Sequence, residues 1–180
     1  GSRAAANHTG VLVGKDTAYG AAFKRAGICR ADTFDALFDS ATALALQPTP
    51  KGDRVLIITN SGGSGTISAD AVEKAGLNVA TLGEELARQL RRALPAAAFI
   101  DNPIDISAAA EPRHYAAALD IVAAEGSFDA VLIVLAPQYM TEPAATVRAI
   151  VAHLDENMPV LAAFLGGGDI MPSRQELAAA

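Results

Sequence analysis

The sequence has no tryptophan, only three tyrosines and a single cysteine, Cys29. One cysteine cannot form an internal disulfide, so packing rather than cross-linking must stabilise the fold, and a cytoplasmic location is expected. No apolar run is long enough to span a membrane and no signal peptide is recognisable, so no membrane partner is expected. The net charge is −6 and there is no basic stripe, which argues against nucleic acid as a partner.

Apolar residues, in contrast, are plentiful, and 180 residues suffice for one α/β domain with an appendage. Two helices are expected first. One is capped by Asp16 or Thr17 and stops at Gly27, and the other is capped by Asp32 or Thr33. The stretch QPTPKGD, residues 47–53, combines two prolines with a glycine and is the best candidate for a linker.

Beyond this linker, strand-like and helical patterns alternate. Strand-like apolar runs occur at residues 54–59, 77–80, 97–100, 130–135 and 160–164. Helical patterns separate them, the first at residues 67–75. Alternating strands and helices predict an α/β fold, a parallel five-stranded sheet with helices on both faces. The lengths suit a flavodoxin-like strand order 2-1-3-4-5, although periodicity alone does not fix the order.

Two distinctive loops follow the first and third of these strands. In an open α/β sheet, ligands meet the carboxyl ends of the strands where the strand order reverses. With the order 2-1-3-4-5 that point lies between the first and third strands. The loops TNSGGSGT, residues 59–66, and DNPIDIS, residues 101–107, are therefore expected to be neighbours.

The loop TNSGGSGT has the composition of an anion-binding turn. Its glycines let the backbone come close to a ligand, and the helix that follows offers free N–H groups and a positive dipole end. No lysine follows the glycines and G-x-G-x-x-G is not matched, so a plain tight turn is the alternative. The candidate phosphate-binding residues are Asn60, Ser61, Gly62, Gly63, Ser64 and Gly65.

The loop DNPIDIS offers Asn102 and Asp105 as candidate site residues. A simple turn is the competing interpretation, because Pro103 disfavours helix at Asn102 and Asp105 can cap local N–H groups. Asp101 and Asp105 together suggest a metal, but no ligand set with a recognised spacing accompanies them. No metal site is therefore expected.

His8 lies in the small-residue segment ANHTG, which has neither helical nor strand periodicity. A lone histidine in a loop is usually incidental. An imidazole on a glycine-flanked loop is also a natural carrier for a phosphoryl group that moves between sites. Both interpretations stay open on these residues alone.

The segment RAAANHTGVLVGKDTAYGAAFKRAGICRADTFDALFDSA resembles the one that carries the phosphorylated histidine in ADP-forming (NDP-forming) acyl-CoA synthetases, relatives of succinyl-CoA synthetase. Further blocks match in order: KGDRVLIITNSGGSGTISADAVEKAGL, DNPIDIS, FDAVLIVLAPQYMTEPA and a closing GGG. The resemblance implies that His8 is the phosphorylated histidine, with Asn7 where the family commonly has serine. It also implies that the TNSGGSG turn holds the phosphoryl group carried by His8.

The resemblance further implies a reaction and a domain organisation. Acyl-CoA, phosphate and ADP would interconvert with free acid, CoA and ATP through an acyl phosphate and a phosphohistidine. Residues 1–47 would end a succinyl-CoA-synthetase-like domain, and residues 48–180 would form a flavodoxin-like CoA-ligase domain. As an excised piece the chain would hold no cofactor and be inactive alone. The intact enzyme would use CoA, ATP or ADP, and Mg, with CoA-binding and ATP-grasp domains in the same protein or a partner subunit.

Two other functions stay open at this stage. Synthetase-like regions fused to protein acetyltransferases are regulatory and can lose the histidine, so His8 favours the enzyme over that alternative. A flavodoxin-like module for FMN or a nucleotide would need aromatic rings, and none of the three tyrosines lies in the two distinctive loops. The carboxylic acid and the choice between ADP and GDP are left open.

Overall fold

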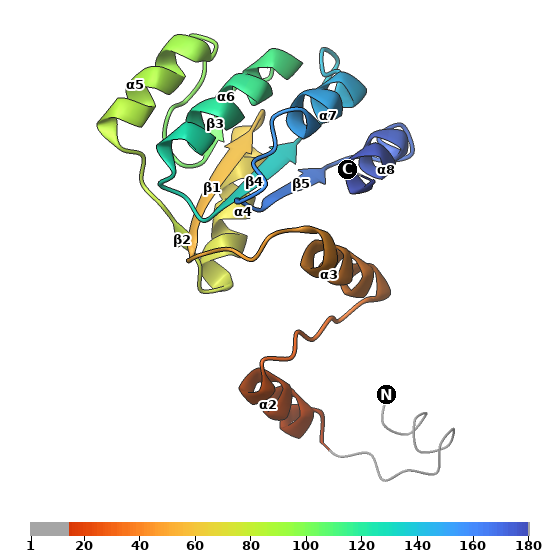
Figure 1. Ribbon diagram of the computed structural model, residues 1–180. Helices are drawn as coiled ribbons and strands as arrows, with labels where there is room; N and C mark the ends of the chain where they lie inside the picture. Colours follow the sequence, from red (N-terminus) through yellow and green to blue (C-terminus); the bar gives the residue numbers. More distant parts are fainter. Residues whose placement is uncertain (1–14, 180) are drawn as a thin grey trace. The chain divides into compact units, whose positions relative to one another are not determined.

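A computed structural model describes residues 15–179 of the chain (Figure 1). The chain divides into two compact units between Ala43 and Leu44. The expected domain boundary between residues 47 and 48 stays a prediction. Within the described residues, no helix is long and apolar enough to cross a membrane.

The first unit contains helix α2 (Asp16–Ala26) and most of α3 (Phe34–Leu46). Helix α2 ends at Gly27, whose φ of 68° lies in the left-handed region that glycine tolerates best. At the start of α3, the Oγ1 of Thr33 accepts the backbone N–H of Ala36 at 3.1 Å. The predicted helix stop and the predicted cap at Thr33 are therefore confirmed. The predicted cap of α2 at Asp16 or Thr17 is wrong, because Lys15 precedes the helix and no described side chain caps it.

The second unit is built on a parallel sheet. Its strands are β1 (Arg54–Thr59), β2 (Asn78–Val79), β3 (Ile104–Asp105), β4 (Ala130–Leu135) and β5 (Val160–Phe164). Strand β4 pairs with β1 from Val55 to Thr59, and β5 pairs with β4. Strand β4 therefore occupies one whole edge of β1. The other edge of β1 is shared by β2 and β3. Strand β2 pairs with the beginning of β1, and strand β3 pairs with the end of β1.

Helices cover both faces of this sheet (Figure 1). Helix α4 (Gly62–Lys74) packs on one face, where Val72 meets Val55, Ile57 and Val134. Helices α5 (Glu84–Ala93), α6 (Pro112–Glu125) and α7 (Pro143–Val151) pack on the other, over Leu56, Ile58, Ile133 and Leu135. Helix α8 (Met171–Ala178) lies beside α7. The predicted α/β fold is confirmed.

Two details of the predicted sheet are wrong. Residues 97–100 are not a strand, since Phe99 makes only an isolated antiparallel bridge with Asp105 and is 66% exposed. The third strand is the two-residue β3 within DNPIDIS, of which Ile104 is buried, and two residues are too few for periodicity to detect. The order 2-1-3-4-5 is also wrong, because β4 pairs directly with β1 and β3 shares the opposite edge of β1 with β2. Helix α4 starts at Gly62, five residues before the expected position.

The side chain of Asn102 fills the gap between β2 and β3 along the edge of β1. Its Oδ1 accepts the N–H of Ile57 at 2.9 Å. Its Nδ2 donates to the carbonyl oxygens of Val55 and Ala80, both at 2.8 Å. One carboxamide thus supplies the partners that a continuous strand would otherwise provide.

We predict that Asn102→Ala lowers the free energy of unfolding by about 2–4 kcal/mol, because it leaves the N–H of Ile57 and the carbonyl oxygen of Ala80 without partners and removes one of the two donors to the carbonyl oxygen of Val55. Urea unfolding of the 180-residue chain measures the change. Asn157→Ala is the matched control, since within the described part of the chain that carboxamide bonds to Asp155 alone, in an exposed turn, and it should cost no more than about 0.5 kcal/mol. Equal losses in the two variants would contradict the bridging role of Asn102.

Candidate functional site

The loops that follow β1, β3 and β4 meet at the carboxyl end of the sheet. A Cβ added at Gly65 would lie 3.2 Å from the Cβ of Pro103, so TNSGGSGT and DNPIDIS are in contact. Asn60 is hydrogen-bonded to Ala136 in the loop after β4. The two distinctive loops are therefore neighbours as expected, although they meet through β3 pairing beside β1 and not through the predicted strand order.

Local hydrogen bonds shape the turn between β1 and α4. The Oγ1 of Thr59 accepts the N–H of Ser61 at 3.1 Å, and the Oγ of Ser64 donates to the carbonyl oxygen of Ser61 at 3.0 Å. Both hydroxyls therefore serve the turn itself. Ser61 is extended, with φ −152° and ψ 116°, and its side chain makes no cap hydrogen bond to α4.

The first turn of α4 is left open to an acceptor from outside. Within the described residues, the backbone N–H groups of Gly62, Gly63 and Ser64 have no hydrogen-bond partner. The first N–H groups of any helix lack partners in the helix, and its dipole places partial positive charge there. This end of α4 therefore has the chemistry of an anion-binding turn.

The three glycines of the turn have different surroundings. At Gly65 a Cβ would lie 3.0 Å from the Cγ2 of Thr59 and would also crowd Pro103, so this glycine allows α4 to pack closely. At Gly63 no described residue lies within 4 Å of an added Cβ. The space in front of Gly63 is therefore open, whereas Gly65 is enclosed by protein.

Asp105 brings a carboxylate to the same turn. Its Oδ1 accepts the N–H of Ser107 at 2.9 Å. Its Oδ2 lies 3.2 Å from the position of a Cβ on Gly62. A negative charge beside the first turn of a helix interacts favourably with the helix dipole. The carboxylate of Asp105 also repels any other anion that approaches the same N–H groups.

Asn60 does not direct its side chain at the open turn. It is 2% exposed, its Oδ1 accepts the N–H of Ala136 at 2.8 Å, and its Nδ2 donates to the carbonyl oxygen of Ala136 at 2.9 Å. The Nε2 of Gln138 donates to the backbone oxygen of Asn60 at 3.3 Å. Ala136 and Gln138 were not among the residues predicted for the site. The one sequence signal for their presence there is that they follow an apolar strand.

Comparison with known proteins identifies the two parts of the sequence. Residues 1–44 match the family model described as succinyl-CoA ligase like flavodoxin domain, and residues 55–166 match the Ligase-CoA domain. The chain belongs to the Ligase-CoA domain family. Its resemblance to NDP-forming acyl-CoA synthetases is thereby confirmed.

Relatives of this Ligase-CoA chain are longer proteins. It is 39% identical over 172 residues to acetate–CoA ligase [ADP-forming] II subunit alpha of Pyrococcus furiosus, covering 93% of this chain and 37% of that one. It is 37% identical over 122 residues to 4-hydroxybutyrate–CoA ligase [ADP-forming] of Nitrosopumilus maritimus, covering 68% and 17%. The chain thus spans about a third or less of the length of these relatives.

A solved structure has the same fold. The acetyl-coenzyme A synthetase 1 of Ca. Korarchaeum cryptofilum, described as dinucleotide forming and in complex with phosphate and ADP, matches with a TM-score of 0.88 and 30% identity. The match covers 99% of this chain and 40% of that one. The crystal structure of PH0766 from Pyrococcus horikoshii OT3 matches with a TM-score of 0.83 and 31% identity, covering 93% and 39%.

His8 lies outside the described residues, so its candidate role as nucleophile stays a prediction. The roles assigned to the TNSGGSGT residues, Asn102 and Asp105 also stay predictions. Between residues 15 and 179, no group of three or more His, Cys, Asp or Glu side chains could hold a metal ion. The Mg implied for the intact enzyme therefore finds no ligand set among these residues.

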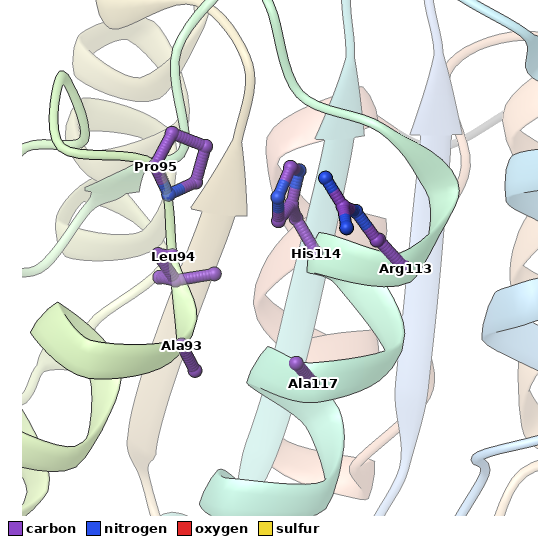
Figure 2. Close-up of a pocket in the computed structure, with 6 residues that line it drawn as sticks. All are labelled: Ala93, Leu94, Pro95, Arg113, His114 and Ala117. Carbon is purple, nitrogen blue, oxygen red and sulfur yellow. The ribbon is translucent and has the colours of Figure 1, made fainter.

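A hollow of about 430 Å³ lies elsewhere, between the end of α5 and the start of α6 (Figure 2). None of the residues predicted for the site lines it. One of the residues that line the hollow, His114, caps the start of helix α6. Its Nδ1 accepts the N–H of Glu111 at 2.9 Å. Burial lowers the pKa of His114, the charge of Arg113 lowers it further, and Glu111 opposes both. His114 is therefore a neutral helix-capping group.

We predict that Gly65→Ala lowers the free energy of unfolding by about 1–3 kcal/mol through overpacking against Thr59 and Pro103. Gly63→Ala should be neutral, or stabilising by up to about 1 kcal/mol, because alanine favours helix and nothing obstructs its methyl group. The two substitutions are matched, since both replace glycine by alanine in the first turn of α4. Urea unfolding gives both values, and a larger loss at Gly63 would contradict the described packing.

We also predict that protonation of His114 destabilises the fold. Because the folded pKa lies below the ordinary value, the unfolded chain binds this proton more readily, and stability falls as the pH drops through about 6.5. In His114→Gln the amide oxygen can still cap Glu111 and does not titrate. The loss of unfolding free energy from about pH 7.5 to about pH 6 should therefore be smaller in this variant. Identical pH profiles would contradict the prediction.

Proposed function

We propose that this chain is part of an ADP-forming acid–CoA ligase and that its α4 turn receives the phosphoryl group carried by a phosphohistidine. The observation that carries the proposal is the open first turn of α4. Three N–H groups there lack partners among residues 15–179, and they lie within the segment that matches the Ligase-CoA domain. Backbone N–H groups at a helix N-terminus bind phosphate without any cationic side chain.

The proposed reaction transfers one phosphoryl group in three steps. Phosphate displaces CoA from the acyl-CoA thioester, which gives an acyl phosphate and free CoA. A ring nitrogen of His8 then attacks phosphorus, the bond from phosphorus to the carboxylate oxygen breaks, and the free acid leaves. Finally a terminal oxygen of ADP attacks the phosphohistidine, which forms ATP and regenerates the imidazole.

The α4 turn would act in the second and third steps. The phosphoryl oxygens accept hydrogen bonds from the N–H groups of Gly62, Gly63 and Ser64, and the helix dipole stabilises their charge. A helix end of this kind is worth about 0.3–2 kcal/mol for an anion. The open space at Gly63 lets the phosphoryl group reach the backbone.

Several similarities support this assignment. The relatives in Pyrococcus furiosus and Nitrosopumilus maritimus are named ADP-forming CoA ligases, and the similar Korarchaeum structure is described with phosphate and ADP. We propose that the CoA-binding and ATP-grasp domains lie in the same protein or in a partner subunit. We also propose that acyl-CoA and a carboxylic acid are the substrates.

The experiment is phosphoryl labelling of the full-length ligase that contains this chain. ATP labelled in its γ-phosphate should place a label on His8 that survives base and is lost in acid. The Gly63→Val variant should label at least about tenfold more slowly, a loss of about 1.4 kcal/mol of transition-state stabilisation, because its side chain blocks the approach to the backbone. Its melting temperature should stay close to that of the unaltered ligase.

Two controls make this result decisive. His8→Ala should abolish the label, and retention of the label would remove His8 from the reaction. Normal labelling of a correctly folded Gly63→Val ligase would leave the turn with a connecting role only. No label on folded, unaltered ligase would favour the regulatory function over the catalytic one.

A further inference from the structure

Asn60 occupies an unusual position between β1 and the open turn. It is polar and 2% exposed, and it directly precedes Ser61, the residue before α4. A ligand-binding carboxamide would be expected to face the space in front of the helix. Instead its oxygen and its nitrogen are both hydrogen-bonded to the backbone of Ala136.

This pair extends the sheet beyond the last backbone rung. The pairing of β1 with β4 ends at Thr59 and Val134. The carbonyl oxygen of Leu135 accepts the N–H of Leu165 on the β5 side. Successive residues of a strand direct their backbone groups to opposite edges, so Ala136 turns its N–H and C=O toward β1. The carboxamide of Asn60 meets them where the next residue of β1 would otherwise pair.

The backbone of Asn60 is held by the same loop. The Nε2 of Gln138 donates to the Asn60 carbonyl oxygen. The loop itself is closed by Gln138 and Thr141, through a backbone bond of 2.9 Å and a side-chain bond of 2.9 Å. Three hydrogen bonds thus fix Asn60 to an ordered loop on the β4 side, immediately before the N–H groups of the turn.

The side-chain hydrogen bonds within the turn are local. They join Thr59, Ser61 and Ser64 to one another and cannot by themselves fix its direction relative to the sheet. On the other side, the N–H of Ile106 donates to the carbonyl oxygen of Thr59 at 2.7 Å, and Gly65 packs against Pro103. Asn60 is therefore the residue that ties the start of the turn to the loop after β4.

We propose that Asn60 is a positioning residue for phosphoryl binding: it aims the N–H groups of Gly62, Gly63 and Ser64 without touching the phosphoryl group. This inference rests on the proposed function of the turn. It assigns to Asn60 a role through the backbone in place of the direct contact expected from the sequence. The carboxamide is required because both a donor and an acceptor must face Ala136.

The test is a titration of the ¹⁵N-labelled 180-residue chain with inorganic phosphate. In the wild type, phosphate should shift the amide signals of Gly62, Gly63 and Ser64. In Asn60→Ala the affinity read from those signals should fall about fivefold, the scale of one lost hydrogen bond. In Asn60→Asp the phosphate affinity should fall further, because the aspartate keeps the acceptor but places a negative charge against the Ala136 carbonyl oxygen.

Two further variants separate positioning from stability. Val131→Ala truncates a buried side chain of β4, 1% exposed, that lies outside the turn. It should destabilise the fold yet leave phosphate affinity unchanged while the chain is folded. Gln138→Ala removes an exposed side chain that holds the Asn60 carbonyl oxygen, and it should weaken phosphate binding about twofold. It provides the test if Asn60→Ala does not fold.

Hydrogen exchange at the Ala136 amide is the accompanying signature. It should accelerate in Asn60→Ala and stay slow in Val131→Ala. Wild-type affinity in folded Asn60→Ala, or in Gln138→Ala if the former is unfolded, would overturn the positioning role and leave the anion site intact. Absence of any phosphate shift at residues 62–64 in the wild type would overturn the anion site, and the positioning role with it.

Discussion

Two asparagine carboxamides complete the hydrogen bonding of β1, and the arrangement of the site depends on them. Asn102 bridges the edge shared by β2 and β3, while Asn60 adds a rung beside β4. A carboxamide can do this because it carries the same donor and acceptor as a peptide group. Both side chains therefore join distant loops to the central strand. The open end of α4 starts from a strand that is held on both sides.

The glycines of the turn that follows β1 have different roles. Gly65 allows α4 to approach Thr59 and Pro103, so its small size serves packing. Gly63 faces open space, so its small size leaves the backbone accessible. A sequence made of serines and glycines does not distinguish these tasks, because both need only the absence of a Cβ. The distinction becomes visible once neighbouring loops are in place.

Long apolar runs made much of this fold predictable. The strands at residues 54–59, 130–135 and 160–164 were predicted with their correct bounds because they are continuous apolar, β-type segments. Strand order was not predictable, since it depends on which edge of β1 each later strand finds. The two-residue β3 gives no periodic signal. The partners of Asn60 and Asn102 were equally hidden, because they lie 76 and 45 residues away along the chain.

The charge around the turn fits a phosphoryl group that is held briefly. The turn contains no lysine or arginine, and the Oδ2 of Asp105 lies close to Gly62. Strong binding of the phosphohistidine would deepen a ground state and slow the transfer to ADP. Backbone N–H groups opposed by a nearby carboxylate stabilise the phosphoryl group only moderately. Under the proposed function, the lack of cationic side chains in the turn therefore limits how strongly the phosphoryl group is bound. The direction of the backbone N–H donors, which Asn60 sets, supplies the selectivity for the transferring group.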